Sequence, residues 1–280
     1  MTEWNELLGT VGVWRGVADV DPDLAVEIER MGYGTIWQGG SPGADLVAAE
    51  RLLEATDDLR VATGIVNIWK SDAAELADSF HRIESRHRGR LYLGLGSGHR
   101  EATPERVRPL DAMSRYLDVL DEGGVPVGRR VLSALGPRML ELAARRSAGT
   151  HPYLTVPAQT AQARAALGAG ALIAPEQTVV LDPDPESARA SARGFLKRYL
   201  KMSNYTNTMQ RGGFSAEDVA GGGSDRLVDA IVAHGDTAAV ASRVRAHLAA
   251  GADHVCVQVV PVSPDVRPAL RSIAAELGLG

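Results

Sequence analysis

Short apolar runs alternate with segments of helical period along the whole chain. The runs, each of a length that suits a buried strand, are residues 10–14, 35–37, 60–69, 90–96, 125–135, 153–155, 177–181 and 254–260. The segments between them carry helix start signals, such as the Asp-Pro pair at Asp21 and the Asp-Thr pair at Asp236. Eight alternations of strand and helix predict an α/β fold, the (β/α)8 TIM barrel.

One segment breaks this alternation. Residues 201–234 contain the polar run Asn-Tyr-Thr-Asn and the glycine run Gly-Gly-Gly-Ser, and neither run suits a buried strand or a long helix. We interpret the segment as an insertion between strand 7 and strand 8. No linker divides the rest of the sequence, so residues 1–280 are predicted to form a single domain.

The composition is that of an ordinary globular protein. Hydrophobic residues make up 45% of the chain, charged residues 23%, and the net charge is −5. Without a basic excess, a nucleic acid or an anionic membrane is not expected as a partner. The only cysteine, Cys256, lies in an apolar run and is interpreted as a small core residue. With no signal peptide and no long apolar run, we expect a cytoplasmic protein.

The candidate chemistry lies where the strands end, because barrel enzymes carry their sites at the C-terminal ends of the strands. The fourth run and the loop that follows it contain Gly94, Gly96 and Gly98, which leave the backbone open to a close neighbour. Such a loop can hold a phosphate through its amides or lie against a flat ring, or the glycines can simply turn the chain. A Rossmann site is disfavoured because the third glycine comes too early and no acid ends a strand about twenty residues later.

Hydrolytic and metal-dependent chemistry are also disfavoured. No two carboxylates converge at the strand ends, and no Gly-x-Ser-x-Gly elbow occurs. The seven histidines show no His-Glu-x-x-His spacing, and there is no second cysteine, so no metal site is predicted.

Several segments taken together resemble the luciferase-like flavin and deazaflavin oxidoreductases, and within them the branch that uses coenzyme F420. The segments are TGIVNI at 63–68, LGLGSGH at 93–99, LGPRMLELA at 135–143, HPYLTVP at 151–157, NYTN at 204–207 and DVAGGGSDRL at 218–227. The resemblance extends over nearly the whole chain and rests on the set of motifs.

This resemblance implies a set of cofactor contacts. The third strand is implied to hold a non-proline cis peptide at Gly64–Ile65 that bulges against the middle of the deazaflavin ring, with Asn67 placed to hydrogen-bond the cofactor. Ser97 and Gly98 match contacts of the fourth strand. The loop after strand five is implied to hold the cofactor's side chain through backbone amides, at Leu135, Gly136 and Arg138.

The chain also departs from related sugar-phosphate dehydrogenases. Where those enzymes carry an Asp-His pair after the second strand, this chain has Gln38-Gly39-Gly40, so that general base is absent. Where they carry a glutamate after the fourth-strand glycine, it has His99, whose imidazole titrates near neutrality. His99 is therefore the candidate catalytic proton donor as well as a cofactor contact. The alternative is that it only binds cofactor or packs at the barrel mouth.

The rim of the barrel suggests the kind of substrate. It carries Trp14, Trp69, His151 and Tyr153, which favour an apolar or aromatic molecule over a sugar phosphate, unless these side chains are ordinary core. The preferred function is an oxidoreductase that passes a hydride between coenzyme F420 and a small organic substrate.

Two rival functions stay open. In the first, the same fold binds FMN and acts as a luciferase-like monooxygenase. In the second, the barrel binds a cofactor or ligand without turnover, a hypothesis that the missing Asp-His pair motivates. A small-molecule substrate is the expected partner in the preferred case, and the resemblance also suggests a homodimer formed through barrel helices.

Overall fold

The computed structural model describes residues 3–98, 108–263 and 265–280. Every strand pairing in this part of the chain is parallel, in the order β10-β9-β11-β1-β2-β3-β5-β6-β7-β8, with β4 also paired to β5. The strands are β1 (Val11–Gly16), β2 (Thr35–Gly39), β3 (Arg60–Thr63), β4 (Val66–Asn67), β5 (Leu91–Gly96), β6 (Arg130–Leu132), β7 (Gly149–Thr150), β8 (Leu172–Ile173), β9 (Glu176–Leu181), β10 (Ala233–Gly235) and β11 (Val255–Val259).

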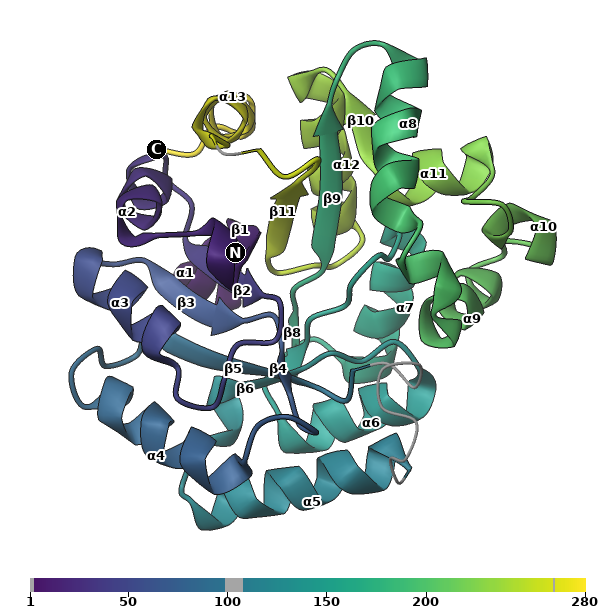
Figure 1. Cartoon of the computed structure of the whole chain (residues 1–280). Helices are drawn as coiled ribbons and strands as arrows, with labels where there is room; N and C mark the ends of the chain where they lie inside the picture. Colours follow the sequence, from purple (N-terminus) through teal and green to yellow (C-terminus); the bar gives the residue numbers. More distant parts are fainter. Residues whose placement is uncertain (1–2, 99–107, 264) are drawn as a thin grey trace.

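Residues 172–181 join the two ends of this sheet. On one side, the amide of Leu172 donates to the carbonyl oxygen of Ala148 at 2.8 Å, beside β7. On the other side, the carbonyl oxygen of Ile173 accepts from the amide of Asp253 at 2.9 Å, and β9 then pairs with β11. The sheet therefore curls round on itself, which confirms the predicted α/β fold of the TIM-barrel type (Figure 1).

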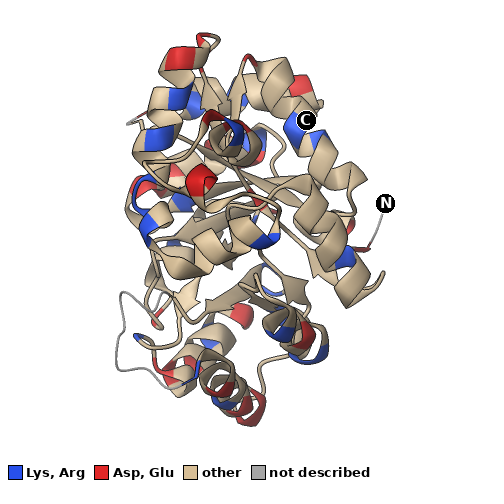
Figure 2. Ribbon diagram, turned by 90° about the vertical axis from the view of Figure 1, so that its right-hand side faces the viewer, with Lys and Arg blue, Asp and Glu red and all other residues tan. Residues whose placement is uncertain are grey.

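Helices cover the outside of the curled sheet, and the predicted caps begin several of them. Asp21 caps α2 by accepting from the amide of Leu24, and Asp236 caps α12 by accepting from Ala239. The long helices are α2 (Pro22–Arg30), α3 (Val47–Ala55), α4 (Ala73–Glu84), α5 (Pro109–Glu122), α6 (Pro137–Arg146), α7 (Pro157–Leu167), α8 (Pro185–Leu196), α12 (Thr237–Ala249) and α13 (Arg267–Leu277). The short N-terminal helix α1 (Glu3–Leu8) was not predicted. Charged residues lie mostly on the helices and loops and are rare in the strands (Figure 2).

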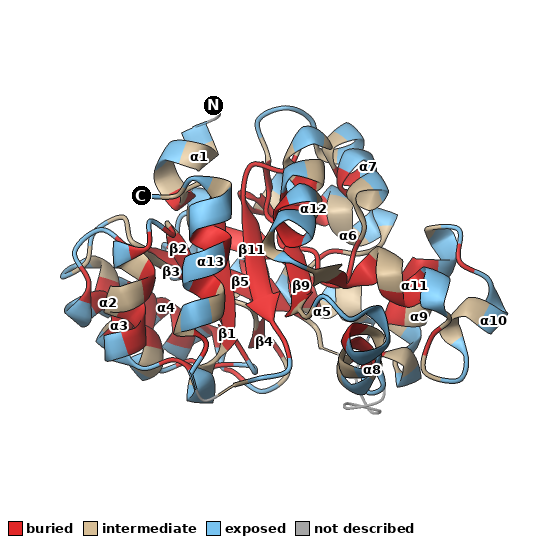
Figure 3. Ribbon diagram, turned by 90° about the horizontal axis from the view of Figure 1, so that it is seen from above, coloured by how far each residue is buried: buried red, intermediate tan, exposed pale blue. Residues whose placement is uncertain are grey.

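Alternation along the strands separates two apolar layers. Val13 and Ile36 belong to the larger core between sheet and helices, whereas their neighbours Trp14 and Trp37 belong to an inner cluster. Cys256 also belongs to the inner cluster and is fully buried, as predicted for a core thiol. Buried residues follow the strands and the helix faces turned toward them (Figure 3). The strand residues of the inner cluster fill the barrel interior, which we call the lumen below, and the same cluster extends outward to Leu196 and Leu227.

The sixth strand was predicted at the wrong place. Residues 153–155 form no strand. The strand that pairs with β6 lies earlier in the sequence and is β7. Pro152 has no amide hydrogen to donate to a ladder, and Leu154 has a φ of +55°, which turns the chain away from the sheet. Tyr153 and Leu154 are buried because they pack in the lumen. The short strands β8 and β10 were not predicted.

The segment predicted as an insertion lies between β9 and β11 and forms three helices, α9 (Ser203–Arg211), α10 (Ala216–Val219) and α11 (Asp225–Ile231), followed by β10. These helices group at one side of the barrel next to α8 (Figure 1). The Tyr205 ring lies 6.1 Å from the Tyr153 ring, and Arg211 donates to the carbonyl oxygen of Leu135 at 3.3 Å. Helix α9 therefore packs against the loops that follow β6 and β7.

In the described ranges, no helix is both long and apolar enough to cross a membrane. Helix α5 extends from Pro109 to Glu122, shortly after the undescribed residues 99–107.

Candidate functional site

The third strand is broken at the position that the resemblance implied. Strand β3 ends at Thr63, β4 begins at Val66, and the peptide bond between Gly64 and Ile65 is cis, as predicted. The amide of Gly64 donates to the carbonyl oxygen of Gln38 at 2.7 Å, which holds this segment to the end of β2. The two residues are half-buried at the strand ends, where a barrel carries its site.

The glycines of β5 make room for this segment. A Cβ on Gly94 would lie 1.8 Å from the carbonyl oxygen of Thr63, and a Cβ on Gly96 would lie 2.7 Å from Cδ1 of Ile65. The close neighbour predicted for this glycine run is therefore the protein's own third strand. Gly94 and Gly96 lie within β5 and serve the packing of β3 and β4 against it.

Four predicted site residues meet beside this break. The side-chain oxygen of Asn67 accepts from the amide of Trp69 at 3.0 Å, and Nε1 of Trp69 donates to the carbonyl oxygen of Ser97 at 2.7 Å. A Cβ on Gly98, which has a φ of +56°, would lie 2.6 Å from Nδ2 of Asn67. Asn67, Trp69, Ser97 and Gly98 thus form one group at the ends of β4 and β5. His99, the predicted catalytic residue, lies outside the described residues.

Two buried polar atoms in the lumen face Gly64. The place that a Cβ would take on Gly64 lies 2.9 Å from Nε1 of Trp14 and 3.5 Å from Nε2 of His151. Neither nitrogen has a hydrogen-bond partner among the described residues, although both are buried. Because an unpaired buried polar group costs free energy, such a pair marks a place where a ligand can supply the missing hydrogen bonds.

The state of His151 follows from its other nitrogen. Nδ1 lies 2.7 Å from the carbonyl oxygen of Ala174, which can only accept, so Nδ1 carries the hydrogen. Burial lowers the pKa of His151 to about 4, and the ring is therefore neutral near pH 7. Its Nε2 presents a lone pair toward Gly64, while the indole of Trp14 presents an N–H. The site thus offers one acceptor and one donor side by side.

A second lumen histidine, His254, differs from His151 in its hydrogen bonding. His254 is equally buried, with a pKa lowered to about 4 by burial, but both of its nitrogens are paired. Nδ1 donates to the carbonyl oxygen of Gly9, and Nε2 accepts from Nε1 of Trp37 at 3.0 Å. Trp37 also stacks on His151, with ring centroids 4.0 Å apart. His254 and Trp37 are therefore satisfied internally, and His151 is not.

Tyr153 connects the lumen to the insertion side of the barrel. Its ring lies 5.6 Å from that of Trp14, and its hydroxyl donates to the side-chain oxygen of Gln258 at 2.7 Å. The same hydroxyl lies 3.0 Å from that of Tyr199. Trp14, His151 and Tyr153, which were predicted as substrate contacts, therefore belong to one cluster, whereas Trp69 lies with Asn67 and Ser97.

Glu176 is a lumen carboxyl that the sequence analysis missed. Its two oxygens accept from Thr178 at 2.5 Å and from the amide of Leu154 at 3.3 Å. Burial raises the pKa of Glu176 to about 8, so the group is protonated near pH 7. An acid inside a buried strand, in the run Pro175-Glu176-Gln177, is the signal that could have identified it.

The residues predicted to hold the cofactor's side chain lie after β6. Gly136 is the N-cap of α6 and gives that helix no side-chain cap; Pro137 has no amide hydrogen and Met139 donates to the carbonyl oxygen of Gly136 at 3.1 Å, so Arg138 carries the first-turn amide that an anion could bind. Leu135 is half-buried beside the lumen, and Arg138 is exposed in the first turn.

Comparison with known proteins agrees with this architecture. The model of the luciferase-like monooxygenase family matches residues 17–123. A search of curated proteins gave no match. An F420-dependent secondary alcohol dehydrogenase in complex with an F420–acetone adduct aligns with a TM-score of 0.75 at 14% identity, over 96% of this chain and 98% of the other.

Two further solved structures differ in cofactor. The coenzyme F420-dependent tetrahydromethanopterin reductase from Methanopyrus kandleri aligns with a TM-score of 0.71 at 17% identity, over 96% of this chain and 98% of the other. The oxygenating constituent of 3,6-diketocamphane monooxygenase from Pseudomonas putida, in complex with FMN, aligns with a TM-score of 0.66 at 14% identity, over 96% of each chain. The predicted resemblance is confirmed: this chain is luciferase-like in the sequence of residues 17–123 and in its fold over nearly its whole length.

Proposed function

We propose that the protein is an F420-dependent oxidoreductase that transfers a hydride between coenzyme F420 and a small, apolar or aromatic organic substrate. The observation that carries the proposal is the pair of unpartnered lumen atoms, Nε1 of Trp14 and Nε2 of His151, that face Gly64. The structural similarity to F420-dependent enzymes supports it at the level of fold.

The chemistry of this pair suits the polar edge of a deazaflavin or flavin ring. That edge presents an N–H flanked by two carbonyl oxygens. His151 offers an acceptor for the N–H, and Trp14 offers a donor for one carbonyl. Both nitrogens lie within 3.5 Å of one point, so a single flat molecule can reach both. Gly64 has no side chain, which lets both nitrogens lie this close to the backbone at the end of β3.

The residues around this point would hold the remainder of the cofactor. Asn67, Ser97 and Gly98 lie together at the ends of β4 and β5, beside the Gly64–Ile65 peptide. The loop before α6 and the start of that helix, at Leu135, Gly136 and Arg138, would hold the cofactor's phosphate side chain through backbone amides. When bound, a deazaflavin exchanges a hydride with the substrate at carbon 5 of its central ring.

The lumen supplies orientation and a low dielectric for that transfer. The aromatic side chains Trp14, Trp69, His151 and Tyr153 would bound the reacting molecules and exclude water. His99 is proposed to move the proton that accompanies reduction, on the strength of the resemblance. Neutral His151, with its pKa of about 4, is a poor proton donor at pH 7 and serves as a hydrogen-bond acceptor.

A paired titration tests this function. Purified protein is titrated with coenzyme F420 and, separately, with FMN, and binding is followed by the fluorescence of each cofactor. We expect saturable F420 binding with a dissociation constant on the order of 1 μM and FMN binding at least about tenfold weaker. The reverse preference would favour an oxygen-using flavin monooxygenase. Binding of neither cofactor would contradict the proposed function and favour a barrel without redox chemistry.

A further inference from the structure

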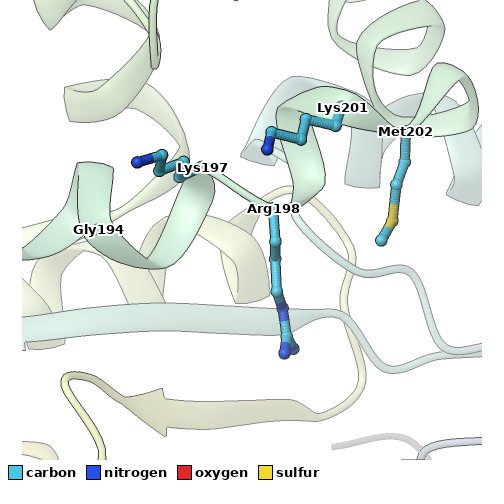
Figure 4. A pocket seen from close by; sticks show the side chains of 5 residues that line it. All are labelled: Gly194, Lys197, Arg198, Lys201 and Met202. Atoms are coloured by element: carbon cyan, nitrogen blue, oxygen red, sulfur yellow. The ribbon is translucent and has the colours of Figure 1, made fainter.

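The end of α8 and the 3-10 helix η4 (Tyr199–Lys201) surround a surface cavity. Its volume is about 440 Å³, and it is lined by Gly194, Lys197, Arg198, Lys201 and Met202. Lys201 extends across toward the end of α8, and Arg198 extends toward the strands (Figure 4). Three cationic side chains and no acidic side chain thus line the same cavity, in a chain whose net charge is −5.

These cations differ from their neighbours in having no carboxylate partner. Earlier on α8, Arg189 pairs with Asp229 at 2.6 Å, and Arg193 pairs with Asp225. No ion pair within 4.0 Å involves Lys197, Arg198 or Lys201 among the residues that the structure describes. Within residues 3–98, 108–263 and 265–280, no carboxylate therefore compensates the positive charge at the cavity.

The choice of lysine is itself informative. The chain contains 30 basic residues of these two types, and its only lysines are Lys70, Lys197 and Lys201. Two of the three line this one cavity. An ammonium group on a flexible stem presents three donors to an oxyanion in any orientation, whereas a guanidinium requires a planar fork geometry.

The cavity is connected to the lumen by direct contacts. The guanidinium of Arg198 donates to the hydroxyl of Tyr199 and lies 4.5 Å from the centre of that ring. The Tyr199 hydroxyl meets that of Tyr153, whose ring packs on Trp14. An anion held at Lys197 and Lys201 would therefore lie on the side of the barrel where Tyr199 contacts Tyr153.

We propose that this cavity is a subsite for a carboxylate or phosphate group carried by a small molecule that reacts in the barrel. The inference rests on the proposed function for the identity of the reacting molecule, but the anion site itself can be tested without any cofactor. It assigns one acidic group to a molecule that reacts in the barrel.

The three lysines allow a direct test. Reductive methylation with a ¹³C label keeps their positive charge and gives each lysine its own NMR signal, assigned with the variants Lys70→Arg, Lys197→Arg and Lys201→Arg. The labelled protein is titrated with inorganic phosphate and, separately, with acetate at constant ionic strength. We expect the signals of Lys197 and Lys201 to shift saturably with at least one of the two anions, while the signal of Lys70 stays in place.

A substitution sharpens the test. Lys197→Gln should weaken the anion affinity read at Lys201 by about tenfold, and Lys70→Gln should leave it unchanged. Equal shifts at all three lysines, or none, would overturn the proposal.

Two further titrations identify the source of the anion. If F420 alone shifts the Lys197 and Lys201 signals, the acidic group is the cofactor's. If phosphate or acetate still shifts them in F420-saturated protein, the group is the substrate's.

Discussion

Replacing His151 by asparagine is expected to weaken F420 binding by about tenfold or more while leaving the fold intact. The asparagine amide can keep the hydrogen bond that Nδ1 donates to Ala174, but it lacks the lone pair that Nε2 directs toward Gly64. Losing one ligand hydrogen bond costs about 1 kcal/mol, and the gap left beside the ligand adds to this. The lost stacking on Trp37 should lower the free energy of unfolding by about 1 kcal/mol.

His254→Asn is the matched control. His254 is also buried and neutral at pH 7, but its Nε2 accepts from Trp37, so its loss leaves a buried N–H unpaired. The free energy of unfolding should fall by about 1–3 kcal/mol, whereas F420 affinity of the folded protein should not change. Chemical denaturation and fluorescence titration measure the two quantities. Equal loss of affinity in both variants would show that the open nitrogen of His151 has no special role.

Replacing Gly94 by alanine is expected to damage both the fold and cofactor binding. The added methyl would lie 1.8 Å from the carbonyl oxygen of Thr63, a backbone atom that can move only if β3 separates from β5. We expect a loss of about 3 kcal/mol or more in the free energy of unfolding. Because Gly64 follows Thr63 directly, F420 affinity of the folded fraction should also fall by about tenfold or more.

Gly128→Ala provides the comparison for this variant. Gly128 is exposed just before β6, and a Cβ there would meet no atom within 4 Å. Thermal unfolding of the control should stay within a few degrees of the wild type. If Gly94→Ala unfolds at the same temperature as Gly128→Ala and binds F420 normally, the strands tolerate a side chain at position 94, and the account of the β5 glycines is wrong.

The sequence predicted most of the architecture because the signals involved are local. Caps such as Asp21 and Asp236 act on amides three residues away, and strand periodicity needs only a few residues. The cis peptide at Gly64–Ile65 was predicted from the resemblance. By contrast, β7 was misplaced because Tyr153 and Leu154 are apolar residues that pack in the lumen and not in a strand. A local sequence pattern does not distinguish these two kinds of buried position.

The composition of the site was harder to predict. Tyr153 meets Gln258 across 105 positions of the chain, and Trp14 meets Tyr153 only after the barrel has closed. Nothing in the local sequence distinguishes His151, which keeps an open nitrogen, from His254, because the difference depends on which histidine accepts the N–H of Trp37. The glycines of β5 were recognised as making room for a neighbour, but that neighbour proved to be Ile65 and the Thr63 carbonyl.

The most direct measurement of the central claim is a crystal structure of the protein with F420 bound. The account predicts that the deazaflavin ring lies against Gly64 and Ile65, with its polar edge within hydrogen-bond distance of Nε1 of Trp14 and Nε2 of His151. A ring bound elsewhere, with both nitrogens still unpaired, would contradict the account.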